Sequence, residues 1–200
     1  MLIELLTLEG QHISLEPLSF DRYDQLCEAS ADEAIWRWTA SHAETPAQMR
    51  AYIETALRWQ AEGTSLPFAI IEKSSCRAIG STRIAEIDRT NCNAEIGYSW
   101  INTLWQRTFV NTEAKYLLLR HAFETLHCIR VWLRTDALNE RSRNAILRLG
   151  AKEEGILRNH MITRTGRIRD TVMFSIIDSE WETVKANLEE KLSRSYQCLR

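Results

Sequence analysis

The stretch LWQRTFVNTEAKYLLLRHAF, residues 104–123, decides the fold, because it begins as a polar turn and continues as a helix with one apolar face. Beyond Asn111 the apolar residues recur at three- and four-residue spacing, and they are Ala114, Leu117, Leu118, Ala122 and Leu126. The first N–H groups of a helix have no acceptor within it, and the helix dipole favours negative charge there. The start of this helix is therefore a candidate site for a pyrophosphate.

Strand-like stretches flank this helix on both sides. NAEIGYSWI (93–101) precedes it and CIRVWLRT (128–135) follows it. A strand–helix–strand unit implies a right-handed crossover and parallel pairing of its two strands. The remaining strands are joined mostly by short turns, which favours antiparallel pairing. We expect an α/β (α+β) fold with a mixed, mostly antiparallel central sheet.

The other elements follow from the same periodicities. Further strands are expected near residues 12–18, 66–73, 77–87, 154–163 and 169–177, and helices near 21–29, 46–61, 139–150 and from 179 onward. No repeat, low-complexity tract or linker rich in Pro and Gly separates them. A chain of 200 residues is a normal length for one core, so residues 1–200 are expected to form a single domain.

Composition excludes several classes of protein. With 44% hydrophobic and 26% charged residues, the chain is neither disordered nor fibrous. No apolar run approaches the roughly 18 residues of a membrane span, and the first ten residues carry acids where a secretory signal carries bases. We expect a cytoplasmic protein. The five cysteines are odd in number and lack a CxxC pair, so neither a disulfide framework nor a metal site is indicated.

The two halves of the chain differ in charge. Residues 1–100 hold 8 Lys and Arg against 15 Asp and Glu, whereas residues 101–200 hold 17 against 12. The basic half suits a polyanionic ligand such as a nucleotide diphosphate, and the acidic half suits a cationic or amine substrate. A solvated mosaic of charges would give the same counts. Nucleic-acid binding by the arginines between Arg141 and Arg169 is disfavoured, because the net charge is −2 and no recognition motif accompanies them.

Four blocks occur in order with family-like spacing: AEIGYSW, WQRTFVNTEAKYLLLRHAFE, RTDALNERSRNAILRLGAKEEGILRNH and GRIRDTVMFSIIDSEW. Together they resemble the GNAT superfamily of N-acetyltransferases over nearly the whole chain. More narrowly, NTEAK, NERS and RDTVMFSI with the following EW resemble the branch of ribosomal-protein-type N-terminal alanine acetyltransferases. The resemblance implies a central parallel strand pair, 93–101 and 128–135, that splays apart and receives acetyl-CoA in the resulting V.

The resemblance also implies donor-binding residues. Main-chain groups near Ser99, Trp100 and Ile101 would pair with the pantetheine arm and hold the thioester oxygen, although Trp100 is equally suited to the core. The family's phosphate loop would correspond to Gln106, Arg107, Thr108, Val110, Asn111 and Thr112. Phe109 and Asn111 stand where the family usually has small residues. A left-handed Phe109 would store roughly 1–2 kcal/mol of strain, and Asn111 could cap the helix. We expect a working loop with the Phe109 ring turned outward; weakened or lost CoA binding is the alternative.

Asn139 and Ser142 match the family's Asn-x-x-Ser pattern. The resemblance implies that the Asn139 amide binds pantetheine and that the Ser142 hydroxyl lies near the leaving thiolate. A helix cap and a small packing residue are the structural alternatives. Many family members carry a Tyr general acid seven residues after the Asn, where this chain has Ile146. Ser142, a water or a basic group would then protonate the thiolate, or the thiolate leaves unaided.

Acyl transfer needs a neutral amine, which bears on the acceptor. Deprotonating an α-amine at pH 7 costs about 1.4 kcal/mol, whereas a lysine costs about 4.6 kcal/mol. Without an obvious strong base, α-amines are the easier acceptors. Glu95 is the preferred base, directly or through water, because it shares a strand face with Gly97 and Ser99 at the cleft. A solvated or salt-bridged strand glutamate without a catalytic role would give the same pattern. Glu86 and His160 are alternative bases, and either could equally be a structural residue.

Two tryptophans are candidates for the acceptor site. Trp36 and Trp38 lie between the first two helices, a region that resembles the substrate-facing rim of the family; core packing or a dimer contact would explain them as well. The leading hypothesis is an acetyl-CoA-dependent N-acetyltransferase that works by direct attack in a ternary complex, since no Cys or His lies in a motif for a covalent intermediate.

Several points stay open from the sequence. The rival hypothesis is a catalytically idle GNAT-like binding module in which Phe109 fills the phosphate site. The acceptor could be a free amino acid, a polyamine, an antibiotic amine or a protein N-terminus, and the chain could form a homodimer.

Overall fold

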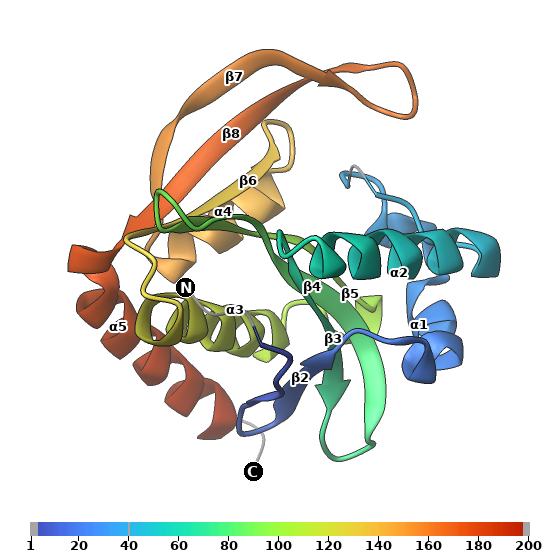
Figure 1. Cartoon of the computed structure of the whole chain (residues 1–200), viewed down its shortest axis with the longest axis horizontal. Helices are drawn as coiled ribbons and strands as arrows, with labels where there is room; N and C mark the ends of the chain where they lie inside the picture. The colour runs from blue at the N-terminus through green and yellow to red at the C-terminus, as the bar shows by residue number, and fades with distance from the viewer. Residues whose placement is uncertain (1–3, 40, 198–200) are drawn as a thin grey trace.

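The computed structural model describes residues 4–39 and 41–197, and within them eight strands form one sheet in the order β1-β2-β3-β4-β5-β6-β8-β7 (Figure 1). The strands are β1 (Leu8–Glu9), β2 (Ile13–Pro17), β3 (Leu66–Glu72), β4 (Arg77–Asp88), β5 (Asn93–Ile101), β6 (Arg130–Asp136), β7 (Lys152–Ile162) and β8 (Ile168–Ile177). Among the pairings of these strands, β5 with β6 is parallel and the others are antiparallel. The expected mixed sheet is confirmed.

The helices connect and cover these strands. They are α1 (Tyr23–Ser30), α2 (Pro46–Ala61), α3 (Val110–Arg120), α4 (Glu140–Leu149) and α5 (Asp178–Gln197), with short helical turns η1 (Phe20–Arg22), η2 (Glu33–Ile35), η3 (Thr103–Trp105) and η4 (His121–Thr125). Local sequence explains their ends. Thr45 and Gln48 form a capping box at the start of α2, and Gly150 ends α4 in a left-handed conformation with φ 101°.

Two apolar clusters pack around the sheet. The larger one joins buried residues of α3, α4 and α5 to the strands β1 to β6 and β8, and the smaller one joins α1 and α2 to β3, β4 and Trp100 of β5. Figure 1 shows α3 beside α5 on the left, with α1 and α2 on the right. Within the described residues, no helix combines the length and the apolar character that crossing a bilayer requires.

The parallel pair β5 and β6 splays apart as expected. Pairing covers Asn93 with Arg130, Ala94 with Val131 and Glu95 with Trp132. Beyond this point β5 continues to Ile101 and β6 continues to Asp136, and the pairing does not continue with them. The two strands thus diverge from Glu95 and Trp132 onward, and the mouth of the V lies toward their C-terminal ends.

Irregular backbone accompanies this divergence. Tyr98 of β5 and Glu86 of β4 adopt left-handed conformations, with φ of 52° and 46°, and the β4–β5 register shifts between Ala85 and Asp88. A left-handed conformation costs a non-glycine residue roughly 1–2 kcal/mol. Bulges of this kind bend a strand and redirect its side chains, and they are frequent beside active sites.

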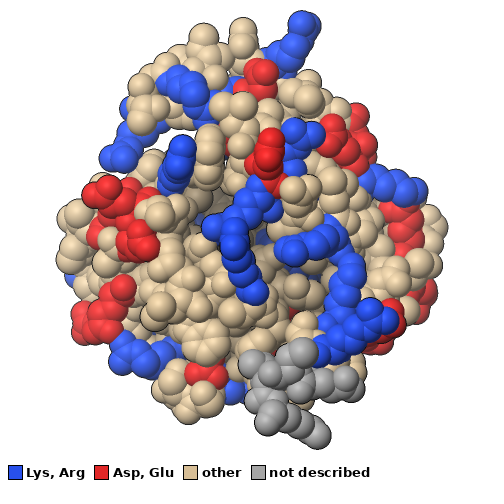
Figure 2. Space-filling model, turned by 180° about the vertical axis from the view of Figure 1, so that it is seen from behind, with Lys and Arg blue, Asp and Glu red and all other residues tan. Residues whose placement is uncertain are grey.

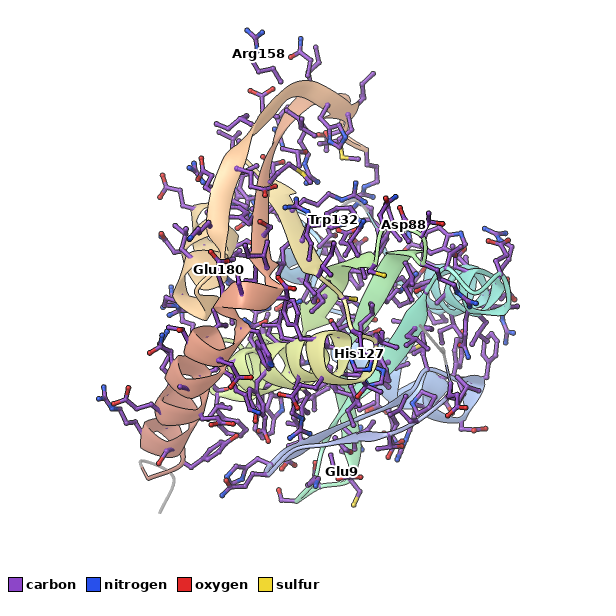
Figure 3. The ribbon with its side chains drawn as sticks, turned by 60° about the vertical axis from the view of Figure 1, so that its left-hand side comes forward. Glu9, Asp88, His127, Trp132, Arg158 and Glu180 are labelled. Carbon is purple, nitrogen blue, oxygen red and sulfur yellow. The ribbon has the colours of Figure 1, made fainter. Side chains whose placement is uncertain are left out.

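The β7–β8 hairpin rises away from the rest of the sheet and curls over it (Figure 1). In Figure 3, Arg158 of β7 lies at the top of the view, while Trp132 of β6 and Asp88 of β4 lie below it. Near its tip, the Arg164 guanidinium lies 3.9 Å from the Glu44 carboxylate, which comes from the segment between α1 and α2. The tip of the hairpin therefore approaches the segment between α1 and α2.

Candidate active site

The carboxylate of Glu95 lies at the point where β5 and β6 separate. Its side chain is 3% exposed, and both of its oxygens accept hydrogen bonds of 3.1 Å from the guanidinium of Arg134. The same guanidinium donates to the Glu86 carboxylate at 2.9 Å. Burial raises the pKa of Glu95 to about 6, against the opposing effect of the Arg134 charge and with a further rise from the charge of Glu86. A carboxylate with this pKa is mostly ionised at neutral pH, yet it can accept a proton.

Gly97 leaves room for this carboxylate. A Cβ atom at position 97 would lie 2.6 Å from Oε1 of Glu95, closer than two such atoms approach. The absence of a side chain at this position is thus a condition for the observed placement of Glu95. Of the alternative bases, Glu86 reaches the same guanidinium, whereas His160 lies on the edge strand β7, which β8 separates from β6.

A buried lysine that the sequence analysis missed lies next to Glu95. Lys115 of α3 donates from Nζ to the Ser99 hydroxyl at 2.6 Å, and that hydroxyl is 2.6 Å from the Thr82 hydroxyl. Burial lowers the pKa of Lys115 to about 8, while the negative charge of Glu95 acts in the opposite direction. Its position next to Ala114 and three residues before Leu118, on the buried side of the helix, was the signal that could have revealed it.

The start of α3 presents the expected free N–H groups. The first backbone hydrogen bond of the helix runs from Glu113 N–H to the Phe109 carbonyl, 2.9 Å, and the Val110 N–H donates to the Thr108 hydroxyl at 3.3 Å. Within the described residues, the N–H groups of Arg107, Phe109, Asn111 and Thr112 donate no hydrogen bond. Such a set of donors at a helix N-terminus is suited to an anion.

Phe109 differs from two of our expectations. Its backbone is right-handed, with φ −65° and ψ −21°, and Arg107 takes the left-handed conformation of this loop instead, with φ 63°. The ring is 8% exposed and packs against His12 and Tyr196, at centroid distances of 5.0 and 5.6 Å. The expectation of a ring turned outward is therefore wrong: the ring belongs to the core. The suggested cap at Asn111 is also wrong, because the helix begins at Val110 with Phe109 at the N-cap position.

Gln106 joins three parts of the site. Its amide donates to the Ile101 carbonyl at 2.9 Å, and its carbonyl oxygen accepts from the Arg141 guanidinium at 2.6 Å. The loop is thereby tied to the end of β5 and to α4. Arg141, which the sequence analysis did not assign, and Arg107 are both exposed beside the loop. Figure 2, the view from behind, shows Lys and Arg side chains gathered around a hollow near the middle of that face.

The other residues predicted to bind the acetyl donor are Asn139, Ser142 and Trp100. Asn139 is the N-cap of α4, and its side-chain oxygen accepts from the Ser142 N–H at 3.1 Å, so the amide nitrogen is the part left for a ligand. Ser142 is half-buried in the first turn, and Ile146 is buried. Trp100 is a core residue by its side chain, with its ring centroid 5.3 Å from that of Trp36. The packing of the Trp100 ring does not involve the main chain. The assignment of main-chain groups near Ser99, Trp100 and Ile101 to the pantetheine arm therefore stays a prediction.

The two acceptor-side tryptophans have different surroundings. Trp36 is 1% exposed, and its indole N–H donates to the Ser30 carbonyl at 2.8 Å. Trp36 therefore does not line a pocket, and this assignment is corrected. Trp38 is half-buried, with the guanidinium of Arg167 from the hairpin side 5.8 Å from its ring centroid, so it stays a candidate. Within the described part of the chain, no group of three His, Cys, Asp or Glu side chains is placed to hold a metal ion.

The chain is similar in sequence and structure to known acetyltransferases. Residues 12–152 match the family described as an acetyltransferase (GNAT) domain. The chain is 30% identical over 184 residues to YdaF of Bacillus subtilis, named as a ribosomal N-acetyltransferase, with 88% of this chain and 97% of that protein covered. It is 28% identical to N-acetyltransferase p20 of Bacillus licheniformis, with 88% and 98% covered. A GCN5-related N-acetyltransferase from Brucella melitensis superposes with a TM-score of 0.88 at 32% identity, covering 95% and 86%.

Proposed function

The chain belongs to the GNAT acetyltransferase family and is an N-acetyltransferase; on this premise we propose that it uses acetyl-CoA to acetylate the α-amine of a peptide or protein N-terminus by direct attack. The observation that carries the proposal is the placement of Glu95. A buried carboxylate with a pKa near 6 stands where the two parallel strands separate. The ribosomal N-acetyltransferase name of YdaF supports a protein acceptor.

The residues around the V fit acetyl-CoA, which supplies an activated acetyl thioester. The N–H groups of Phe109, Asn111 and Thr112 are suited to its diphosphate, and Arg107 and Arg141 add positive charge beside them. Main-chain groups of β5 beyond Glu95 lack a partner strand on the β6 side, so they are suited to the amides of the pantetheine arm. One N–H near Ser99, Trp100 or Ile101 would stabilise negative charge on the thioester oxygen.

Glu95 would remove the proton from the acceptor ammonium, directly or through a water. Moving a proton from an α-ammonium with pKa about 8 to a base with pKa about 6 costs about 2.7 kcal/mol, whereas a lysine ammonium would cost about 6 kcal/mol. The neutral amine nitrogen then forms a bond to the acetyl carbon, the carbon–sulfur bond breaks with the electron pair leaving on sulfur, and the nitrogen loses its second proton to water. The α-amine is thus the easier acceptor by about 3 kcal/mol.

Protonation of the leaving sulfur falls to Ser142 or to water, because Ile146 occupies the position at which many family members have a tyrosine. A CoA thiolate is a stable leaving group near its own pKa, since a thiol of pKa about 8.5 is partly ionised at neutral pH. Ser142 lies in the first turn of α4, beside the N-cap Asn139. We therefore propose that protonation by Ser142 contributes only modestly to the rate of acetyl transfer.

The idle-module hypothesis depended on Phe109 filling the phosphate site. The ring packs against His12 and Tyr196, so that hypothesis loses its main support.

Two measurements test the proposal. Acetyl-CoA that binds the folded state must raise the melting temperature in a concentration-dependent way. Release of free thiol must then depend on an acceptor, and N-terminal peptides must react faster than the same peptides with a blocked α-amine and a free lysine. No thermal shift at millimolar acetyl-CoA, together with no thiol release with any acceptor, would contradict the proposed function.

A further inference from the structure

A cavity of about 230 Å³ lies between the C-terminal end of α2, the segment that leads into β3, and the strands β4 and β5. Its walls include Trp59, Glu62, Thr64, Ser65, Glu86 and Tyr98. Because a water occupies about 30 Å³ in the liquid, a cavity of this size has room for a side chain or a small amine.

The cavity shares Glu86 with the cluster around Glu95. Arg134 bridges the carboxylates of Glu86 and Glu95, at 2.9 and 3.1 Å respectively. Tyr98 follows Glu95 by three residues, and burial first and then the charge of Glu95 raise the pKa of its phenol. A group bound in the cavity would therefore lie one side chain away from the base.

Two walls of the cavity are aromatic. The rings of Trp59 and Tyr98 meet edge to face, with their centroids 5.5 Å apart. The buried guanidinium of Arg83 already lies against both rings, 5.5 Å from the Trp59 centroid and 4.8 Å from that of Tyr98. The faces of aromatic rings attract positive charge, so the parts of these rings that Arg83 does not cover can contribute to holding a cation in the cavity.

The lining of the cavity is acidic. Of the residues that the structure describes, it holds the carboxylates of Glu62 and Glu86 and no Lys or Arg side chain, whereas the guanidinium groups of Arg83, Arg89 and Arg134 lie outside the lining. Arg134 is shared by Glu86 and Glu95, and within the described residues the Glu62 carboxylate has no ion-pair partner. A positively charged group entering the cavity would meet Glu62 and Glu86 and would lie beside the aromatic walls.

We propose that this cavity holds a second positive charge of the acceptor, next to the amine that is acetylated. The inference rests on the proposed function and narrows it to a substrate class. The acceptor is an amine with a cationic group a few bonds away, either a peptide whose second residue is Arg or Lys, or a small diamine. The cavity is thus the specificity pocket of the enzyme, and Glu62 and Trp59 are its selecting residues.

The test compares matched acceptors. Peptides beginning Ala-Arg, Ala-Ala and Ala-Asp share one α-amine, and 1,4-diaminobutane is compared with butylamine. We expect kcat/KM for the cationic member of at least one set to exceed that of the neutral member by about tenfold, or about 1.4 kcal/mol. The set that shows the preference identifies the source of the charge. Equal kcat/KM values within both sets would overturn the inference.

Variants link the preference to the cavity. Glu62→Gln should lower the preference about threefold, and Trp59→Leu should lower it about two- to fivefold. Glu54→Gln, which removes the same charge from an exposed position of α2, should leave the preference unchanged. A preference that survives Glu62→Gln and Trp59→Leu at full size would place the selecting site elsewhere and overturn the inference.

Binding without the acetyl donor separates the two proposals. Titration calorimetry should show that the Ala-Arg peptide binds the wild-type protein more tightly than it binds the Glu62→Gln variant, and that raising the salt concentration narrows the difference. Such binding without acetyl transfer would contradict the proposed function and support the pocket. Acetyl transfer with no difference in kcat/KM among the peptides would support the proposed function and contradict the pocket.

Discussion

Replacing Glu95 by Gln should abolish most of the acetyl transfer without weakening the fold. A positioned general base contributes roughly a hundred- to ten-thousandfold to the rate. The pKa of Glu95 is raised from 4.5 to about 6, so the folded state holds this proton more tightly than the unfolded chain does. That difference corresponds to about 2 kcal/mol. The ionised carboxylate therefore lowers stability above about pH 6, and this penalty is absent below about pH 4.5.

Glutamine carries no charge and avoids this penalty, and Arg134 keeps Glu86 as a partner at 2.9 Å. The variant should be as stable as the wild type at pH 4 and up to about 2 kcal/mol more stable at pH 8, because the pKa of about 6 already includes the attraction of Glu95 to Arg134. Urea unfolding at both pH values measures this difference. Thiol release between pH 5 and 9 should show kcat/KM of the wild type rising through pH 6, and the variant should lack that rise.

The matched control is Glu54→Gln, which changes an exposed glutamate of α2. Its rate and pH profile should equal those of the wild type. The reasoning would be refuted if Glu95→Gln kept its rate within about tenfold together with the rise through pH 6. It would also be refuted if the variant lost activity only because it unfolded.

Three further changes probe other parts of the site. Gly97→Ala places a methyl group 2.6 Å from Oε1 of Glu95, so kcat/KM should fall by about tenfold or more with an unchanged circular dichroism spectrum; an unaltered rate would contradict this. Phe109→Gly removes a core ring, so urea unfolding should show a loss of about 3–5 kcal/mol, with little change in acetyl-CoA affinity by calorimetry; a clear gain in affinity would mean that the ring obstructs the loop. Burial lowers the pKa of Lys115 to about 8, so its charge costs stability below that pH and the cost fades as the pH rises toward 10.5. The stability gained by Lys115→Met at pH 7 should therefore shrink by pH 9.5, and a pH-independent difference would argue against a buried charge.

The order of elements could be predicted because the local signals are strong. The apolar spacing of α3, the Gly150 stop of α4 and the turn residues between short strands all act within a few residues. The parallel pairing of β5 and β6 then follows from the crossover between them. Glu95 could be selected because strand alternation places it on the same face as Gly97 and Ser99.

The rest depends on contacts between distant residues. The direction of the Phe109 ring is set by His12 and Tyr196, which are 97 and 87 positions away in the sequence. Trp36 is buried where its indole N–H reaches the Ser30 carbonyl and its ring packs against Trp100. The pairing of Arg134 with Glu95 arises only once β5 and β6 lie side by side. Strand alternation and helix periodicity carry no information about such partners.

The most direct test of the account is a crystal structure of the protein with CoA. The account expects the diphosphate oxygens within hydrogen-bonding distance of the N–H groups of Phe109, Asn111 and Thr112, and the pantetheine arm between β5 and β6 with its sulfur near Glu95. The Phe109 ring should stay between His12 and Tyr196. A diphosphate bound elsewhere, or a Phe109 ring that has to leave the core to admit it, would contradict the account.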